Sequence, residues 1–322
     1  MKFGAVVIGR NEGERLRQCL NSLSTAATIV YVDSGSVDGS AEWARLHGAN
    51  VIESDAAIPF TAARARNAGF NRLRKMAPDL LYVQFMDGDC ELNILWPEQA
   101  LSFLESHKNV GVVCGRLRER YPERSIYNWL CDQEWDGPTG EVRACGGPAM
   151  MRVDALEAVG GYRDDLIAGE EPELCVRLRA TGWHIWRLET EMGLHDAAMT
   201  RFSQWWRRSL RSGYAFAQGA YLHGAPPERH EVWESRRAWL WGIWVPLACL
   251  VIGLSFKPWG WAVLLIYPLH ILQKIFRREG ALRDRALVAL FHVLGHFPES
   301  WGQIKFMREQ LLGLRARLIE YK

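Results

Sequence analysis

The sequence predicts an α/β domain followed by a hydrophobic helical region that attaches the chain to a membrane. Between residues 3 and 114, short apolar runs alternate with segments of helical periodicity. Such alternation is typical of a mainly parallel sheet with helices on both faces. Farther along, residues 238–256 form a charge-free run of 19 residues, which is long enough to cross a bilayer as a helix.

The expected strands and helices follow one another in regular order. The strands are expected at 5–8, 28–32, 51–52, 80–86 and 110–114, and the helices at 11–23, 40–46, 61–76 and 97–107. Each strand is a short apolar run, and each helix has apolar residues recurring on one face. Residues 115–200 instead mix short segments with turns such as Gly146-Gly147. Ligands of such sheets bind at the carboxyl ends of the strands, so the residues after each strand are candidates for a site.

Composition sets the broad class of the protein. The chain has 322 residues, 48% of them hydrophobic, which suits one large catalytic domain plus an appendage and argues against disorder. Its seven cysteines show neither CxxC spacing nor a zinc pattern. They predict free, mostly buried thiols in a reducing compartment. The apolar run at 3–8 is too short for a signal peptide.

The most informative chemical pattern is Asp87-Gly88-Asp89, directly after an apolar strand. The two carboxylates reach one site if the backbone turns, which Gly88 permits. Carboxylate oxygens suit Mg²⁺ or Mn²⁺, ions that also bind substrate phosphates. An isolated pattern of this kind is more often a turn with solvated acids. Further polar loops at the same sheet edge favour the metal site here.

Polar loops also follow the first two expected strands. The first strand leads into Gly9-Arg10-Asn11-Glu12, and the second into the segment 33–40, which begins Asp33-Ser34. Amides and the acid of the second loop would approach a nucleobase, ribose or phosphate. The basic segment 64–69, with Arg66 and Asn67, would supply cations to a diphosphate.

In this order and spacing, the motifs resemble family 2 glycosyltransferases with the GT-A fold. The resemblance covers about residues 3–205 and includes a further segment, Gly169-Glu170-Glu171-Pro172-Glu173-Leu174. It implies a Rossmann-like mixed sheet and an inverting direct displacement. The residues that it assigns to the nucleotide-sugar donor are Arg10, Asn11, Glu12, Asp33, Ser34, Arg66, Asn67, Asp87 and Gly88.

The same resemblance implies particular roles at the site. Asp33 would meet the base of the donor, and Asp87 would lie near its ribose or diphosphate. Asp89, with Asp87, would hold Mn²⁺ or Mg²⁺. Some GT-A enzymes use a histidine near position 195 as a further ligand of the metal or diphosphate, so His195 is a third candidate ligand, with a structural role as the alternative.

An inverting displacement by a hydroxyl group needs a general base beside the acceptor. The family places this base in an acidic pair followed by a helix, and here the pair is Glu170-Glu171, where Glu-Asp is commoner. The resemblance makes Glu171 the base and Glu170 its helper. Acids at a helix start also favour the helix macrodipole, which is the structural alternative.

One further segment bears on processivity. Gln204-Trp205-Trp206-Arg207-Arg208 resembles the QxxRW motif of processive members, but its last residue is Arg208. That departure argues against a processive polymerase.

The C-terminal part predicts a membrane hairpin. Basic pairs flank it, Arg236-Arg237 before and Arg277-Arg278 after, whereas its turn holds only Lys257, and six tryptophans lie between 233 and 261. Two spans would place both basic ends and the catalytic domain on the cytosolic side of the inner (cytoplasmic) membrane. A hairpin lying in the interface and a soluble helical subdomain are the alternatives.

The predicted organisation is a catalytic domain at 1–225, an anchoring hairpin at 226–280 and an amphipathic basic tail at 281–322. From residue 270 onward the chain carries ten basic and five acidic residues, whereas the preceding part carries 29 basic and 32 acidic. A basic, hydrophobic end of this kind favours membrane lipid over nucleic acid as the partner.

The sequence therefore predicts a membrane-attached, metal-dependent glycosyltransferase that uses a nucleotide sugar, with a UDP-sugar favoured, and a membrane-proximal or lipid-linked acceptor. A polyprenyl phosphate as acceptor is one alternative, and an inactive sugar-nucleotide-binding scaffold is another. A sugar-1-phosphate nucleotidyltransferase is a third, although the loop Gly9-Arg10-Asn11-Glu12 lacks the Gly-rich basic pattern of those enzymes.

Overall fold

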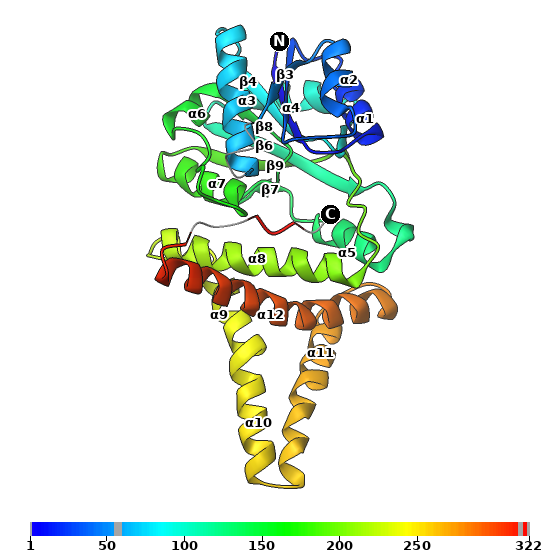
Figure 1. The fold of residues 1–322 in the computed structure, drawn as a ribbon, viewed down its shortest axis with the longest axis vertical. Coiled ribbons are helices and arrows are strands. Elements are labelled where there is room, and N and C mark those ends of the chain that lie inside the picture. The colour runs from blue at the N-terminus through cyan, green and yellow to red at the C-terminus, as the bar shows by residue number, and fades with distance from the viewer. Residues whose placement is uncertain (1, 55–59, 315–317, 321–322) are drawn as a thin grey trace. The chain divides into compact units, whose positions relative to one another are not determined.

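The computed structural model describes residues 2–54, 60–314 and 318–320. It divides into two compact units, Met1–Thr200 and Arg201–Lys322. The first unit is an α/β domain and the second consists of helices (Figure 1).

A nine-stranded mixed sheet forms the centre of the first unit. Its order is β3-β2-β1-β4-β8-β6-β9-β5, and β7 pairs with β9. The strands are β1 (Gly4–Gly9), β2 (Thr28–Asp33), β3 (Asn50–Glu53), β4 (Tyr82–Asp87), β5 (Cys90–Leu92), β6 (Val110–Glu119), β7 (Gly140–Glu141), β8 (Ala149–Arg152) and β9 (His184–His195). The strands β3, β2, β1 and β4 are parallel, whereas β8 is antiparallel to both β4 and β6.

The mixed sheet implied by the family resemblance is thus confirmed. The alternation alone predicted a mainly parallel sheet, but parallel pairing is confined to the β3-β2-β1-β4 part and the β6–β9 pair, and the other strand pairs are antiparallel. Two of the antiparallel strands, β7 and β8, come from the region where the sequence shows no regular alternation.

Helices pack on both faces of this sheet. They are α1 (Glu14–Ser22), α2 (Ser40–Leu46), α3 (Ala62–Met76), α4 (Trp96–Ser106), α5 (Ile126–Glu134), α6 (Val153–Ala158) and α7 (Glu170–Ala180), with a 3₁₀ turn at Pro122–Arg124. Successive strand residues point to opposite faces, so Val6 packs in one apolar cluster with Leu73 of α3, and Val7 in the other with Leu16 of α1.

The register of the sheet brings the polar loops together. Gly9 at the end of β1 lies opposite Asp33, and Ile8 lies opposite Asp87. The backbone extends these contacts beyond the strands, because Gly88 N donates to the Ile8 carbonyl at 2.8 Å. The loops after β1, β2 and β4 therefore share one edge of the sheet.

The second unit is built around two long helices, α8 (Phe202–His223) and α12 (Leu282–Leu311), which lie side by side (Figure 1). Glycines allow this close contact: a Cβ at Gly213 would lie 1.9 Å from the Glu299 carbonyl oxygen, and one at Gly302 would lie 2.1 Å from that of Leu210. The predicted boundaries at residues 225 and 280 stay predictions. Helix α8, which falls within the predicted catalytic domain, packs against α12 and belongs to the second compact unit.

A helical hairpin leads away from α12 within the second unit (Figure 1). Its first arm comprises α9 (Val232–Trp239), a π-helical segment (Leu240–Trp244) and α10 (Val245–Ser255). Its second arm comprises a 3₁₀ segment (Trp259–Leu265) and α11 (Ile266–Phe276).

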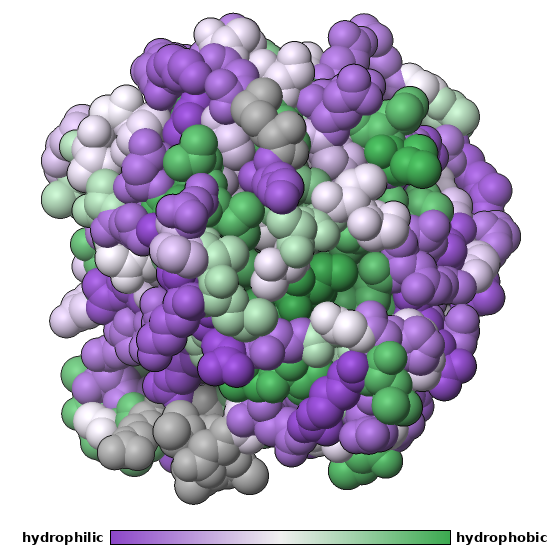
Figure 2. Space-filling view, turned by 90° about the horizontal axis from the view of Figure 1, so that it is seen from above, coloured by the Kyte–Doolittle hydropathy of each residue, from purple (hydrophilic) through white to green (hydrophobic). Residues whose placement is uncertain are grey.

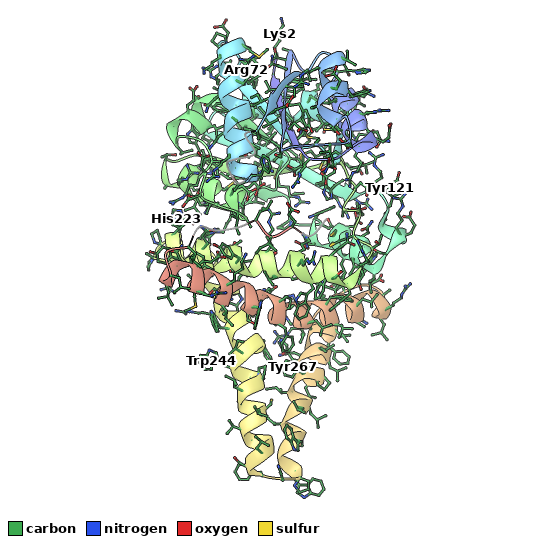
Figure 3. The ribbon with its side chains drawn as sticks, viewed as in Figure 1. Lys2, Arg72, Tyr121, His223, Trp244 and Tyr267 are labelled. Carbon is green, nitrogen blue, oxygen red and sulfur yellow. The ribbon has the colours of Figure 1, made fainter. Side chains whose placement is uncertain are left out.

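Both arms are long and apolar enough to cross a membrane by length and composition. These candidate spans are Val232–Ser255 and Trp259–Phe276, and only 22% and 6% of their most apolar windows are buried. A core helix of a soluble protein would be mostly buried instead. Hydrophilic and hydrophobic residues are interspersed on the face drawn in Figure 2, whereas α10 exposes several large apolar side chains, such as Leu250 and Leu254. Trp244 points away from the hairpin (Figure 3) and is 59% exposed.

Candidate active site

Arg66, on α3, lies at the centre of the candidate active site and is only 2% exposed. Its Nη1 lies 2.9 Å from Glu170 Oε1 and 2.7 Å from Glu171 Oε1. Its Nη2 lies 2.8 Å from Asp87 Oδ1. The Tyr162 ring packs on the guanidinium, 5.6 Å from its carbon to the ring centroid. One buried cation therefore joins three of the motifs that the sequence identifies.

Three carboxylates share this single guanidinium. Burial opposes the charge of Arg66, but Glu171, Asp87 and Glu170 together hold its pKa well above the ordinary value. Burial is the main cause that raises the pKa of Glu171; Arg66 opposes it, the charges of Glu170 and Asp87 add to it, and the resulting pKa is about 7. A carboxyl group with such a pKa can take up or release a proton near neutral pH.

Helix α7 positions the acidic pair. It begins after Gly169, which adopts a positive φ of 76°, a conformation that glycine adopts readily. Both acids lie in the first turn of the helix. The Glu171 side chain is 13% exposed and that of Glu170 is 5% exposed. Glu171 is therefore the more accessible of the two to a bound substrate.

The turn Gly146-Gly147 also lies at this cluster, although the sequence assigned it only to a turn. A Cβ at Gly147 would lie 2.5 Å from Asp87 Oδ2 and 2.8 Å from Arg66 Nη2, whereas a Cβ at Gly146 would meet nothing within 4 Å. Only glycine therefore fits at 147 while the Arg66–Asp87 pair stays in place.

Asp89 takes part in a second cluster, with His195. His195 ends β9 and lies opposite Cys90 of β5. Its Nε2 lies 3.3 Å from Asp89 Oδ2. One ligand atom from each of Asp89, Cys90 and His195 lies within 4.8 Å of the others. The two acids of the Asp-Gly-Asp motif thus have different neighbours, since Asp87 contacts Arg66.

The donor set of this second cluster fits a divalent ion such as Mn²⁺ or Mg²⁺. His195 Nδ1 is buried and has no hydrogen-bond partner within the described part of the chain; it lies 3.8 Å from Glu119 Oε2. Burial, followed by the charge of Asp87, raises the pKa of Cys90 well above its usual value, and a hard ion of this kind prefers oxygen and nitrogen ligands to sulfur. The Asp89 carboxylate and the His195 ring are then the better ligands for such an ion.

Two buried residues beside His195 escaped the sequence analysis. Asn128 Nδ2 donates to Glu119 Oε1 at 2.9 Å, and Ala197 N donates to Glu119 Oε2 at 3.0 Å. Met199 N donates to Asn128 Oδ1 at 2.9 Å. Glu119 and Asn128 therefore fix the segment that follows β9 and, with it, His195. The expected strand ended at residue 114, whereas β6 continues to Glu119.

The predicted base-binding acid, Asp33, shapes its own loop. It is 2% exposed. Its Oδ2 accepts hydrogen bonds from Gly35 N and Ser36 N, and its Oδ1 accepts one from the Tyr31 hydroxyl. Burial and the charge of Asp33 raise the pKa of Tyr31, so this hydroxyl keeps its proton. A contact between Asp33 and a nucleobase stays a prediction.

The loops after β1 and β2 are tied together at the sheet edge. Asn11 Oδ1 accepts a hydrogen bond from Val37 N, and Asn11 N donates to Ser36 Oγ, both at 2.8 Å. Ser34 N donates to the Gly9 carbonyl. Glu12 pairs with Arg15 at 2.7 Å, and Arg10 lies over the Phe60 ring. The predicted donor-binding residues of both loops therefore form one rim.

Asn67 holds a different loop, the one before α7. Its Nδ2 donates to the Tyr162 carbonyl and to Asp164 Oδ1, and its Oδ1 accepts from Tyr162 N. Gly161 has a φ of 75°, and a Cβ there would lie 2.7 Å from Asn67 Oδ1. Asn67 thereby fixes the approach to the acidic pair, and its contact with a donor stays a prediction.

Comparisons with known proteins identify the family and the fold that this chain resembles. Residues 5–160 match the family described as Glycosyl transferase family 2. Glycosyltransferase AglE of Haloferax volcanii is 22% identical over 328 residues, covering 95% of this chain and 97% of AglE. Succinoglycan biosynthesis protein ExoA of Rhizobium meliloti is 28% identical over 188 residues, 54% of each chain.

A solved structure shares the fold. The mannosyltransferase PcManGT from Pyrobaculum calidifontis, in complex with GDP-Man and Mn²⁺, superposes with a TM-score of 0.60 at 18% identity. The match covers 93% of this chain and 86% of PcManGT. Family match, relatives and fold agree with the motifs at the carboxyl edge of the sheet: residues 5–160 form a family 2 glycosyltransferase domain, and the first unit has the GT-A fold.

Proposed function

We propose that this glycosyltransferase moves a sugar, with inversion, from a nucleoside-diphosphate sugar to a membrane-proximal or lipid-linked acceptor. The observation that carries the proposal is the contact of Arg66 with Asp87, Glu170 and Glu171. This contact joins the donor-side motif after β4 to an acid with a pKa of about 7 at the start of α7. The two kinds of group that an inverting transfer needs are thus neighbours.

The nucleotide part of the donor would bind along the rim of Arg10, Asn11, Glu12, Asp33 and Ser34. A UDP-sugar is favoured from the sequence. PcManGT, which shares the fold, is in complex with GDP-Man, so GDP-sugars belong in the same assay.

Asp89 and His195 would hold a divalent cation, Mn²⁺ or Mg²⁺, with Asp87 close by. When bound, such an ion neutralises charge that develops on a leaving nucleoside diphosphate. Among the described residues, His195 Nδ1 has no hydrogen-bond partner, and its Nε2 lies 3.3 Å from Asp89 Oδ2; both observations support this role. The complex of PcManGT contains Mn²⁺.

Glu171 would take the proton from the acceptor hydroxyl. Arg66 and the more buried Glu170 hold its carboxylate in place. An acceptor that is a polyprenyl phosphate brings an oxygen that is already ionised, and it would make this proton transfer unnecessary. That alternative changes the acceptor and keeps the donor site.

The second unit would anchor the enzyme in the inner (cytoplasmic) membrane. Two exposed apolar arms with basic residues at the same end support two spans with the catalytic domain in the cytosol. The similarity to glycosyltransferase AglE extends over 95% of this chain and therefore includes much of the second unit.

Activity is expected to rise with pH through about 7. Glu171 acts as a base only when ionised, and burial raises its pKa to about 7. Below that pH, kcat/KM with a hydroxyl acceptor should fall about tenfold per pH unit, and above it a plateau should follow. A pH profile of initial rates at saturating Mn²⁺ checks this, and a flat profile from pH 5.5 to 8.5 would contradict the role of Glu171.

Gly147→Ala is expected to lower kcat/KM by about 10- to 100-fold. The Cβ of the alanine would displace Asp87 and Arg66 by a fraction of an ångström or more. Gly146→Ala is the matched control, since its Cβ meets no atom within 4 Å. Steady-state rates and melting curves of the two variants check the expectation. Equal activity of both would mean that Gly147 does not pack against the catalytic cluster.

The experiment that tests the proposed function is a transfer assay with membranes that contain the full-length enzyme. Radiolabelled UDP-, GDP- and dTDP-sugars are supplied with Mn²⁺ and a lipid extract, and the organic phase and the released nucleotide are analysed. We expect label in the lipid phase and one nucleoside diphosphate per sugar transferred. Release of pyrophosphate would favour a nucleotidyltransferase, transfer only to small soluble acceptors would contradict the lipid-linked acceptor, and no turnover at all would favour an inactive scaffold.

A further inference from the structure

Basic and histidine side chains gather in the second unit where the hairpin joins α12. His270 and Lys274 come from α11, Arg237 from α9, and His292 and His296 from α12. We call these five residues the hairpin-base cluster. The Nε2 atoms of its three histidines and the Nε of Arg237 are buried without a hydrogen-bond partner in the described part of the chain. Buried polar atoms are nearly always paired, so four such atoms in one place point to a missing partner.

The positive charges of the hairpin-base cluster act on one another. Burial, followed by the charges of Lys274, Arg237, His296 and Arg278, lowers the pKa of His292 to about 3. The His292 ring is therefore neutral, with one nitrogen that donates and one that accepts a hydrogen bond. The cluster thus combines the cationic side chains of Arg237 and Lys274 with the neutral ring of His292.

Acidic partners do not balance these cations. Glu299 Oε2 lies 3.0 Å from Nδ1 of His296, and Glu231 acts on Arg237 only at longer range. Among the residues that the structure describes, neither Lys274 nor Arg237 forms an ion pair with a carboxylate. The hairpin-base cluster therefore carries a net positive charge that an anion would neutralise.

The surrounding helices hold the cluster in a fixed arrangement. The Trp241 ring stacks on His270 with centroids 3.9 Å apart, and the Tyr267 hydroxyl donates to the Trp241 carbonyl at 2.8 Å. A Cβ at Gly242 would lie 2.3 Å from the His296 carbonyl oxygen, so the backbone of the π-helical segment packs closely on that of α12. Such π segments often occur at functional sites.

We propose that the hairpin-base cluster binds the phosphate of an anionic phospholipid from the cytosolic leaflet. A phosphate oxygen accepts hydrogen bonds from histidine, lysine and arginine nitrogens. Anionic lipids are attracted to basic residues at the end of a membrane span. Beyond the cluster the arms of the hairpin expose apolar side chains, such as Leu254 and Leu269, that would contact acyl chains.

This proposal rests on the proposed membrane attachment, but it does not depend on sugar transfer. The full-length protein is reconstituted in nanodiscs of phosphatidylcholine, with or without phosphatidylglycerol. Bound lipid is counted by native mass spectrometry, and the melting temperature is measured. We expect phosphatidylglycerol to be retained preferentially and to raise the melting temperature of the wild type.

The variant Arg237→Gln/Lys274→Gln should lose both effects. The matched control Arg236→Gln/Lys257→Gln removes the same number of charges from exposed positions outside the cluster and should keep them. Arg237→Lys/Lys274→Arg preserves the charges and should also keep them. If the double variant does not fold, the single variant Lys274→Gln is measured in the same way and should show a partial loss of both effects.

Three results would overturn the proposal. One is a folded double variant that prefers phosphatidylglycerol as strongly as the wild type, and another is an equal loss in the control. The third is the same stabilisation by inorganic phosphate in phosphatidylcholine nanodiscs, which would make free phosphate the ligand. A chain that does not enter nanodiscs would contradict the membrane attachment as well, a failure distinct from the loss of lipid preference in an inserted chain.

Discussion

Glu171→Gln is expected to lower kcat by about 100- to 10,000-fold with a hydroxyl acceptor, the usual contribution of a general base. Glutamine keeps the shape of the side chain and a contact with Arg66 but cannot accept the proton. KM for the donor should change little, because the donor-side groups, Asp87 and Asp89, are untouched. Initial-rate kinetics of the purified variant measure both quantities.

The same substitution is not expected to destabilise the protein. The pKa of Glu171 is raised from 4.5 to about 7 in the folded state, so its contribution to stability is present below pH 4.5 and is lost as the pH rises through about 7. At pH 8 the ionised Glu171 is therefore unfavourable where it lies, and glutamine removes that charge. The melting temperature of the variant at pH 8 should equal or exceed that of the wild type.

Glu170→Gln is the matched control, since it removes one carboxylate from the same guanidinium. Its side chain is the more buried of the two, and we expect a smaller loss of kcat. If both variants lose activity equally, the effect comes from the charge around Arg66 and not from proton transfer. If Glu171→Gln keeps substantial activity, the base is elsewhere or the acceptor is a phosphate, as in the polyprenyl-phosphate alternative.

Asp89→Asn is expected to abolish metal-dependent nucleotide binding. Asparagine lacks the negative charge with which Asp89, beside His195, would hold Mn²⁺ or Mg²⁺. A nucleotide at 100 times its dissociation constant should stabilise the wild type by about 2.7 kcal/mol. For the variant, thermal shift assays should show no difference between samples with and without Mn²⁺.

Asp79→Asn, an exposed acid outside the site, controls for the loss of one negative charge and should bind like the wild type. His195→Gln should weaken the dependence on metal without removing it, because the Asp89 carboxylate remains. An Asp89→Asn protein with an unchanged Mn²⁺-dependent shift would show that the ion is held by other residues.

Sequence reasoning succeeded where local rules decide the structure. Apolar runs and helical spacing located β1, β2 and β4 and the helices α2 and α3 to within a few residues. The rule that ligands gather at strand ends then predicted that the loops of Asp33 and Asp87 share one edge, and the register of β1 confirms this. The first helix was expected to begin at residue 11. Instead, α1 begins at Glu14, because Asn11 and Gly13 adopt positive φ.

Contacts between distant segments were beyond such rules. Arg66 meets Glu170 across 104 positions of sequence, and no periodicity encodes that pairing. The requirement for glycine at 147 appears only when Asp87 and Arg66 are in place. The segment from 281 onward was predicted as an amphipathic tail, and most of it forms α12, whose buried residues, such as Phe306, pack within the second unit.

The most direct test of the central claim is calorimetric binding of UDP, GDP and dTDP to the detergent-solubilised, full-length protein, with and without Mn²⁺. A nucleotide-sugar transferase with a metal ion at Asp89 should bind one of the three diphosphates, and should bind it more tightly when Mn²⁺ is present. Failure of all three to bind to a demonstrably folded protein would contradict the account and favour an inactive scaffold.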